Sequence, residues 1–228
     1  MSRMGFWNSM DVASFLTTVS IAAFPILFAI TFHEVAHGWV ARYFGDRTAE
    51  AQGRLSLNPI RHIDPIGTIV VPALMLWLGG FLFGWAKPVP VNPRYMRNPR
   101  SNMVWVSAAG PAINLAMAIV WGALMLLTLN VDLGTAGEWI FGMARVGIYI
   151  NVLLAVFNML PIPPLDGGQV LTNLLPPGPL SSALERIAPF GLFIVLGLIV
   201  TGLLAPLIGR PVAALTGLIA SAFGLPFR

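Results

Sequence analysis

Long apolar stretches alternate with short polar segments along the whole chain. A transmembrane helix needs about 20 consecutive apolar residues, and several of these stretches reach or approach that length. We therefore expect an all-α polytopic membrane protein with about five to six membrane segments, forming one integral membrane domain over residues 1–228. The apolar stretches occupy residues 12–41, 65–85, 103–129, 145–159, 190–208 and 212–227, and the last two flank Arg210 and Pro211.

Two regions between the regular stretches have an irregular pattern. The apolar stretch 65–85 contains Pro72 and three glycines, residues that interrupt helices, so we expect a re-entrant or hairpin segment near 65–100. Residues 53–59 alternate between apolar and polar residues like a short strand. This strand-like element fits an edge strand that pairs with an extended substrate, and it fits a capped surface loop equally well.

Composition supports a membrane protein and excludes several other classes. Hydrophobic residues make up 57% of the chain and charged residues only 10%, whereas an ordinary soluble domain has about 25% charged residues. A net charge of +4, from 13 basic and 9 acidic residues, is too small for the cationic stripe of a nucleic-acid-binding protein. The chain has no cysteine, which excludes disulfides and thiol catalysis.

The first apolar stretch contains three ionisable residues, His33, Glu34 and His37, in the sequence FHEVAHG. A charged side chain near the centre of a membrane helix costs about 2.5–3.5 kcal/mol on insertion scales, so it usually has a partner or a function. His33 and His37 are four residues apart and lie on one face of a helix, where both imidazoles can bind one metal ion. This is the H-E-x-x-H pattern of zinc hydrolases, in which the glutamate is the general base. The same five-residue pattern also arises by chance.

Two histidines do not complete a catalytic zinc site, which normally has three protein ligands. The remaining histidine, His62, lies in a polar segment, where a hydrogen-bonded or solvated role is the better interpretation. Asp166 lies in the proline- and glycine-rich sequence PIPPLDGG, and irregular backbone at membrane depth is tolerated where it lines a cavity. From the residues alone, Asp166 fits a third metal ligand and the N-cap of a following helix equally well.

These motifs resemble those of the site-2 protease family of intramembrane zinc metalloproteases. The chain has the family's H-E-x-x-H motif at 33–37, its G-x-x-x-N element at Gly110 and Asn114, and its N-x-x-P-x-x-x-x-D-G motif at 158–167. The sequence GWAKPVPVNPR at 84–94 is similar to the compact prokaryotic branch, without a PDZ or CBS module. The resemblance implies one zinc ion (Zn2+) per chain with Asp166 as its third ligand, Glu34 as the base, and Asn158 as a catalytic residue that binds the scissile carbonyl or its oxyanion.

The positions of the motifs and of the basic residues predict a topology. The H-E-x-x-H motif lies near the end of the first apolar stretch, and Asp166 lies just beyond the stretch 145–159. Three apolar stretches, 65–85, 103–129 and 145–159, lie between the two motifs, so one of the three makes no net crossing if both motifs share one ion. With 65–85 as that segment, ten of the 13 basic residues lie on the face of the zinc site, which the positive-inside rule makes cytoplasmic for a multi-pass protein of the cell membrane. These ten are Arg42, Arg47, Arg54, Arg61, Lys87, Arg94, Arg97, Arg100, Arg186 and Arg228.

The function that we expect is that of an intramembrane zinc metalloendopeptidase, which hydrolyses peptide bonds in or near transmembrane segments of membrane-protein substrates. Its partners would be such a substrate and the lipid bilayer, with no nucleic acid, and the sequence leaves the oligomeric state open. One alternative is a zinc-binding scaffold without proteolytic activity, which has no need of Glu34. Another is a metal transporter, which is disfavoured because residues 103–129 and 190–208 carry no charge.

Overall fold

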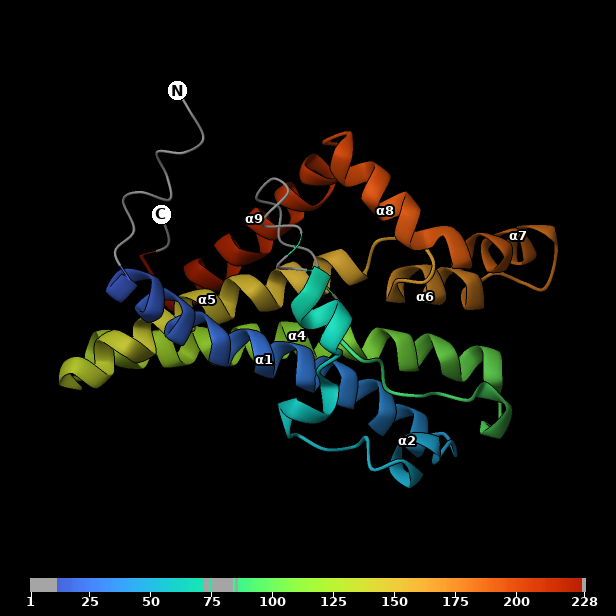
Figure 1. The fold of residues 1–228 in the computed structure, drawn as a ribbon, viewed down its shortest axis with the longest axis horizontal. Coiled ribbons are helices and arrows are strands. Elements are labelled where there is room, and N and C mark those ends of the chain that lie inside the picture. Colours follow the sequence, from blue (N-terminus) through green and yellow to red (C-terminus); the bar gives the residue numbers. More distant parts are fainter. Residues whose placement is uncertain (1–11, 72–73, 75–83, 85, 227–228) are drawn as a thin grey trace.

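The computed structural model describes residues 12–71, 74, 84 and 86–226, and within these residues it contains helices and no strand. The all-α class predicted from the sequence is therefore confirmed for this part of the chain. The main helices (Figure 1) are α1 (Val12–Tyr43), α2 (Thr48–Ala51), α4 (Pro99–Asn130), α5 (Gly134–Asn158), α6 (Asp166–Leu174), α7 (Pro179–Ile187), α8 (Gly191–Val200) and α9 (Leu204–Phe223). The shorter helical turns are η2 (Pro59–His62), η3 (Pro65–Val70), η4 (Pro93–Tyr95) and η5 (Ala188–Phe190).

Among the described residues, five helical segments are long and apolar enough to cross a membrane. This number agrees with the five to six membrane segments expected, and the chain is a multi-pass membrane protein. The five segments are Thr17–Tyr43, Pro99–Asn130, Gly134–Asn158, Pro179–Val200 and Leu204–Phe223.

The central helix of the bundle is α4, which contacts α1, α5, α6 and α9. In Figure 1, α1, α4 and α5 run side by side along the long axis of the molecule. Trp121 and Met125 of α4 form a buried core with Ile148 and Val152 of α5 and with apolar residues of α9. A Cβ at Gly147 would overlap the Trp121 ring, so this glycine allows the large side chain to pack between α4 and α5.

The break between the last two helices is not where the sequence suggested. We expected it at Arg210 and Pro211, but both residues lie inside α9, and the chain turns at 201–203 instead. Gly202 has φ +74°, a left-handed conformation that glycine adopts without a steric penalty and that ends a helix. A proline within an apolar helix is tolerated in membrane proteins, so Pro211 alone was a weak signal for a loop.

The strand-like element predicted at 53–59 forms neither strand nor helix over residues 54–58, and the part of the chain that the structure describes contains no partner strand for it. Hydrogen bonds between side chains and the backbone take the place of a strand pairing. Asn58 Oδ1 accepts a hydrogen bond from the N–H of Ile60 (3.1 Å) and thereby caps η2. Arg54 donates to backbone carbonyls of two neighbouring segments. The element is thus an irregular segment held by side-chain hydrogen bonds.

The segment predicted to be re-entrant begins and ends at one place. The backbone N–H of Lys87 donates to the carbonyl of His62 (2.9 Å), so the ends of the intervening segment adjoin and no net crossing separates them. Its first turn, η3, follows Asp64, whose carboxylate accepts hydrogen bonds from the N–H groups of Ile66 and Gly67. The remainder of this prediction falls on residues 72–73, 75–83 and 85, which lie outside the described residues.

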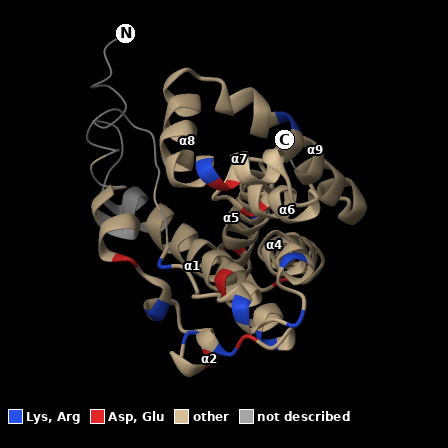
Figure 2. Cartoon of the chain, turned by 90° about the vertical axis from the view of Figure 1, so that its right-hand side faces the viewer, with Lys and Arg blue, Asp and Glu red and all other residues tan. Residues whose placement is uncertain are grey.

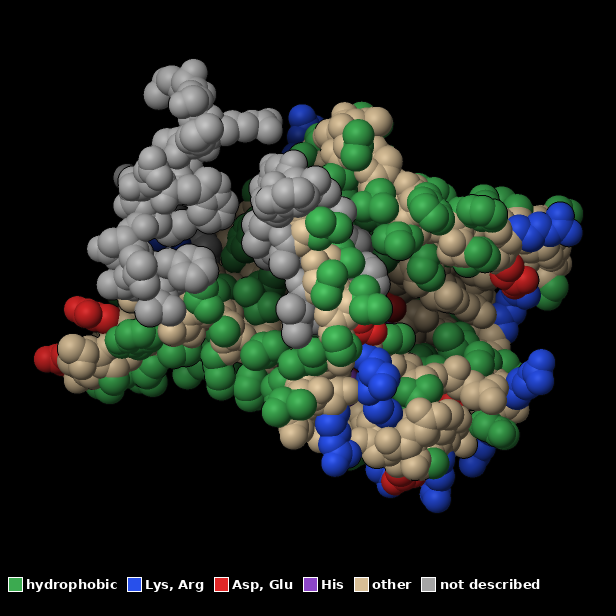
Figure 3. Space-filling view, viewed as in Figure 1, with side chains coloured by type: hydrophobic (Ala, Val, Ile, Leu, Met, Phe, Trp, Pro, Cys, Tyr) green, Lys and Arg blue, Asp and Glu red, His purple; other side chains and the backbone are tan. Residues whose placement is uncertain are grey.

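Basic side chains gather at one end of the molecule. Figures 2 and 3 show Lys and Arg around α2, the start of α4 and α7, with a few acidic side chains among them. Figure 3 also shows acidic side chains at the opposite tip, where α4 meets α5. The segments at the basic end include the C-terminal end of α1 and the proline-rich stretch before α4. This distribution agrees with the grouping inferred from the sequence, apart from Arg228, which lies outside the described residues.

Candidate metal centre

Helix α1 presents both histidines of the H-E-x-x-H motif to the interior. The residues are one helical turn apart, and their rings lie 4.7 Å apart between centroids at an interplanar angle of 86°. His33 is buried, and the His37 side chain is only 13% exposed. The predicted helical spacing therefore places the two imidazoles side by side, as the binding of one metal ion by both requires.

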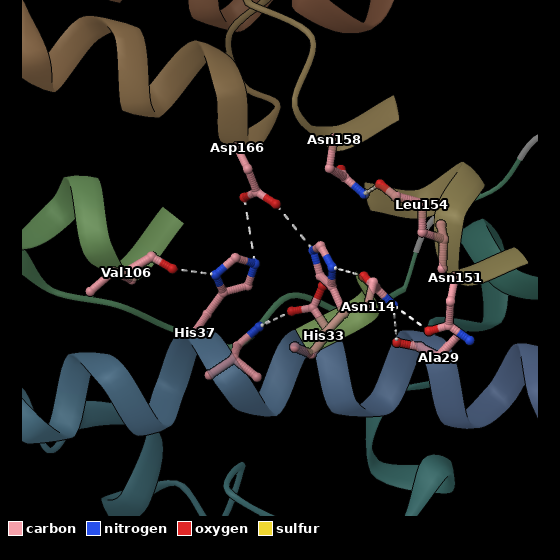
Figure 4. A network of polar contacts seen from close by, with 11 residues as sticks. Ala29, His33, His37, Val106, Asn114, Asn151, Leu154, Asn158 and Asp166 are labelled. Carbon is pink, nitrogen blue, oxygen red and sulfur yellow. Dashed lines mark hydrogen bonds and ion pairs between the residues drawn. The ribbon is translucent and has the colours of Figure 1, made fainter. Parts of the chain in front are cut away.

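Asp166 reaches the same point from the other end of the sequence. It is the first residue of α6, and its carboxylate oxygens lie 3.1 Å from His33 Nε2 and 3.4 Å from His37 Nε2 (Figure 4). The following glycines make this approach possible, because a Cβ at Gly167 or Gly168 would overlap the backbone of the preceding loop. Ligand atoms of His33, His37 and Asp166 all lie within 4.8 Å of one another.

The hydrogen bonds of the imidazoles fix their orientation. His37 Nδ1 lies 2.7 Å from the carbonyl oxygen of Val106, which can only accept, so this nitrogen carries the proton. Asn114 uses its amide N–H groups on Ala29 O and Asn151 Oδ1, which leaves its Oδ1 to accept from His33 Nδ1 at 2.6 Å. In the neutral imidazoles both Nε2 lone pairs consequently face Asp166.

This arrangement fits a metal ion. Nitrogen lone pairs and a carboxylate repel one another unless a proton or a cation lies between them. Asp166 Oδ2 is buried and accepts no hydrogen bond from the described residues. Tetrahedral zinc ligands, about 2.0–2.1 Å from the ion, lie roughly 3.3 Å apart, close to the two separations of 3.1 and 3.4 Å observed here. The set of two imidazoles and one carboxylate also matches a catalytic zinc site.

The charge of Asp166 suits the same role. Burial raises the pKa of this carboxyl, but when His33 and His37 are protonated, their hydrogen bonds and positive charge outweigh burial and lower the pKa below its ordinary value. The carboxyl is therefore ionised at neutral pH. Metal ligation requires a deprotonated carboxylate, so the site holds Asp166 in the form that binds a cation.

Gly110 of α4 provides the space beside the histidines. A Cβ at this position would lie 2.5 Å from His37 Nε2 and 2.6 Å from His33 Cε1. In the sequence, the G-x-x-x-N element was part of the family resemblance, and neither of its residues had an assigned role. The structure gives both residues a place at the site: Gly110 leaves room for the metal-facing atoms, and Asn114 orients His33.

The other predicted site residues lie near the cluster without joining it. Glu34 Oε2 accepts a hydrogen bond from the backbone N–H of Val89 (2.8 Å). Asn158, the last residue of α5, donates from its amide to Leu154 O (3.0 Å) within its own helix, close to the cluster in Figure 4. His62 is buried elsewhere, with Nε2 on the carbonyl of Ser56 (2.8 Å), which agrees with the hydrogen-bonded role favoured for it.

Asn151 and Val106 are residues of the site that sequence reasoning missed. Asn151 of α5 is fully buried, accepts from Asn114, and donates to Gly147 O (2.8 Å). Its position could have revealed it, because an amide side chain in the middle of an apolar helix needs hydrogen-bond partners inside the membrane. Val106 acts through its backbone carbonyl, and no pattern of residue types could have revealed it.

Comparisons with known proteins agree with this geometry. The profile of Peptidase family M50 matches residues 21–136 and 132–198. The chain is 39% identical to "Putative zinc metalloprotease YwhC" of Bacillus subtilis, over 82% of this chain and 84% of the relative. Two proteins with the same designation are Rip2 of Mycolicibacterium smegmatis (32% identity, 86% of this chain, 73% of the relative) and MJ0611 of Methanocaldococcus jannaschii (42% identity, 61% of this chain, 63% of the relative).

No solved structure matches the chain. The family match covers most of the sequence and includes the histidines, the α4 contacts and Asp166. The chain belongs to Peptidase family M50, the site-2 protease family of zinc metalloproteases.

Proposed function

We propose that the protein is an intramembrane zinc metalloendopeptidase in which His33, His37 and Asp166 hold one zinc ion per chain. The observation that carries this proposal is the convergence of two Nε2 lone pairs and one ionised carboxylate on one buried point. Glu34 follows the ligand His33 directly in the sequence and supplies the carboxylate base that a zinc hydrolase needs.

A zinc ion at this point would supply Lewis acidity, which polarises a carbonyl group and lowers the pKa of water. Glu34 accepts the proton of the attacking water and returns it to the leaving amine. Asn158 binds the scissile carbonyl or its oxyanion through its side-chain amide. For this role the amide must exchange its present bond to Leu154 O for a bond to the substrate.

The proposed substrate is a membrane-spanning segment of another protein. The site lies between long apolar helices, and a helical substrate must unwind locally because its carbonyls are engaged in the helix. Helix-breaking residues near the cleaved bond therefore favour hydrolysis. We place the enzyme in the cell membrane as one domain. We orient the site toward the cytoplasm, because α6, which carries Asp166, lies at the end of the molecule where the basic side chains gather.

Glu34→Gln tests the proposal. The variant should retain bound zinc, measured by mass spectrometry of the purified protein, and should no longer cleave a single-span reporter that the wild type cleaves in liposomes. Glu185→Gln, on exposed α7, is the matched control and should cleave normally. Continued cleavage by Glu34→Gln contradicts the mechanism, and zinc binding without cleavage of any single-span protein supports the scaffold alternative.

A further inference from the structure

A buried arginine without an acidic partner lies close to the proposed base. Arg54 is 8% exposed, and no carboxylate of the described residues lies within ion-pair distance of it. Its guanidinium donates instead to three backbone carbonyls: Arg61 O (2.5 Å), Lys87 O (2.8 Å) and Pro88 O (3.3 Å). A buried charge is costly unless it is paired or hydrogen-bonded. The burial of Arg54 against backbone carbonyls therefore suggests that this arginine has a role in the site.

The carbonyls of Lys87 and Pro88 belong to residues 86–92, a segment without helix or strand that contacts α1 through Val89. One end is fixed by the bond from Lys87 N–H to His62 O (2.9 Å), and the other by the bond from Asn92 N–H to Asp46 Oδ2 (2.6 Å). Arg54 therefore holds the two residues that precede Val89, in a segment that is anchored at both ends.

This segment offers few backbone donors, because positions 88 and 90 are proline and have no N–H. The donor between these two prolines is Val89 N–H, and it is bonded to Glu34 Oε2 at 2.8 Å. Gly38 lies four residues after Glu34, on the same face of α1. A Cβ at Gly38 would lie 2.9 Å from Val89 Cγ1, so this glycine permits the segment to approach the helix.

We infer that the N–H of Val89 positions Glu34 for proton transfer, and that Arg54 is the positioning residue that fixes this N–H. The inference rests on the proposed function, in which Glu34 is the base. Hydrogen bonding of Oε2 restricts the carboxylate to one orientation and leaves Oε1 to accept the proton. Outer partners that orient catalytic groups typically change activity about 10–100-fold when they are removed.

Val89→Pro removes the N–H that bonds Glu34 Oε2, because proline has no backbone donor. We expect kcat to fall about 10–100-fold for the single-span reporter that the wild type cleaves, with KM and bound zinc unchanged. Val91→Pro is the matched control, because Val91 also follows a proline and lies on the same segment. It should retain the wild-type kcat.

Arg54→Met should reproduce the fall in kcat, because the carbonyls of Lys87 and Pro88 lose their common donor. Arg61→Met is its control: Arg61 is exposed and donates to Gly53 O (2.7 Å), outside the segment. A wild-type kcat in both Val89→Pro and Arg54→Met, with Glu34→Gln inactive, overturns the inference and leaves the proposed function intact. If Glu34→Gln is active, the proposed function itself fails.

Hydrogen–deuterium exchange tests the contact without any substrate. A peptide covering residues 86–92 reports few amides because of its prolines, so a change at Val89 is resolved. Exchange at Val89 should be faster in Glu34→Ala and in Arg54→Met than in the wild type, and should be unchanged in Arg61→Met. Equal Val89 exchange in the wild type and in Glu34→Ala would show that Glu34 does not bind this amide, and would overturn the inference.

Discussion

Substitution of Gly110 by alanine tests whether α4 shapes the metal centre. The added Cβ would lie 2.5 Å from His37 Nε2 and 2.6 Å from His33 Cε1, whereas carbon atoms in ordinary contact are about 3.5–4.0 Å apart. The histidine rings or the helix must therefore move by about 1 Å. Both rings are hydrogen-bonded to the same helix that carries Gly110, at Val106 O and Asn114 Oδ1, so a retreat from the added Cβ would stretch these bonds.

The size of the effect follows from this displacement. Ligand distances in a metal site are held to about ±0.2 Å, so a movement of about 1 Å is incompatible with the same coordination. Overpacking by one methyl group costs about 1–3 kcal/mol, which corresponds to roughly 5–150-fold weaker zinc binding if the whole penalty falls on the site. We expect catalysis to fall by at least as much, since misplacement by 1 Å can cost about 100-fold in rate.

Zinc affinity of the purified protein, measured by competition with a chromophoric chelator, provides the assay, with thermal unfolding measured in parallel. Gly122→Ala is the matched control on the same helix, because its Cβ would lie 2.9 Å from Phe223 Cδ2 and touch neither histidine. It should lower the melting temperature and leave zinc affinity unchanged. Wild-type zinc affinity in Gly110→Ala, or an equal loss in Gly122→Ala, would refute the reasoning.

Three further predictions concern the same site. Asn114→Ala removes the acceptor of His33 Nδ1 and should weaken zinc binding about 10–100-fold; unchanged affinity in the chelator competition would contradict the orienting role. Removal of zinc by a chelator should abolish reporter cleavage and lower the melting temperature, both of which zinc, but not magnesium, restores; cleavage that persists in metal-free protein would argue against a zinc enzyme. Accessibility tags near Arg54 and near Arg97 should label from the cytoplasmic side of the cell membrane, and labelling from opposite sides would mean that segment 65–85 crosses it.

Much of the site could be predicted because its chemistry conflicts with its surroundings. His33, Glu34 and His37 stand out in an apolar helix, and helical spacing alone brings the two histidines together. Asp166 could be suggested but not chosen, because its distance from the histidines in the sequence is large and only the fold closes it. The resemblance to a known family supplied that choice, and the structure places the carboxylate against both imidazoles.

Other features depend on contacts that residue types do not encode. The break between α8 and α9 is at Gly202 instead of Pro211, because the backbone conformation at a glycine ended the helix. The extent of α4, from Pro99 to Asn130, exceeds the apolar stretch by several polar residues at its start. Proline is favoured in the first helical turn, so α4 begins before its apolar part does.

Helix α4 contributes no expected ligand, and yet it determines how the ligands meet. Val106, Gly110 and Asn114 are spaced four residues apart, so they form one row on the face of α4 that meets the row of His33 and His37 on α1. The N-terminal end of α4 also holds α6, because Arg100 donates to Thr172 O (2.9 Å) and Asn173 O (3.3 Å) at the end of that helix. Since α6 carries Asp166, α4 holds both the histidines and the helix of the third expected ligand in place. The geometry of the ligands therefore depends on a helix that carries none of them.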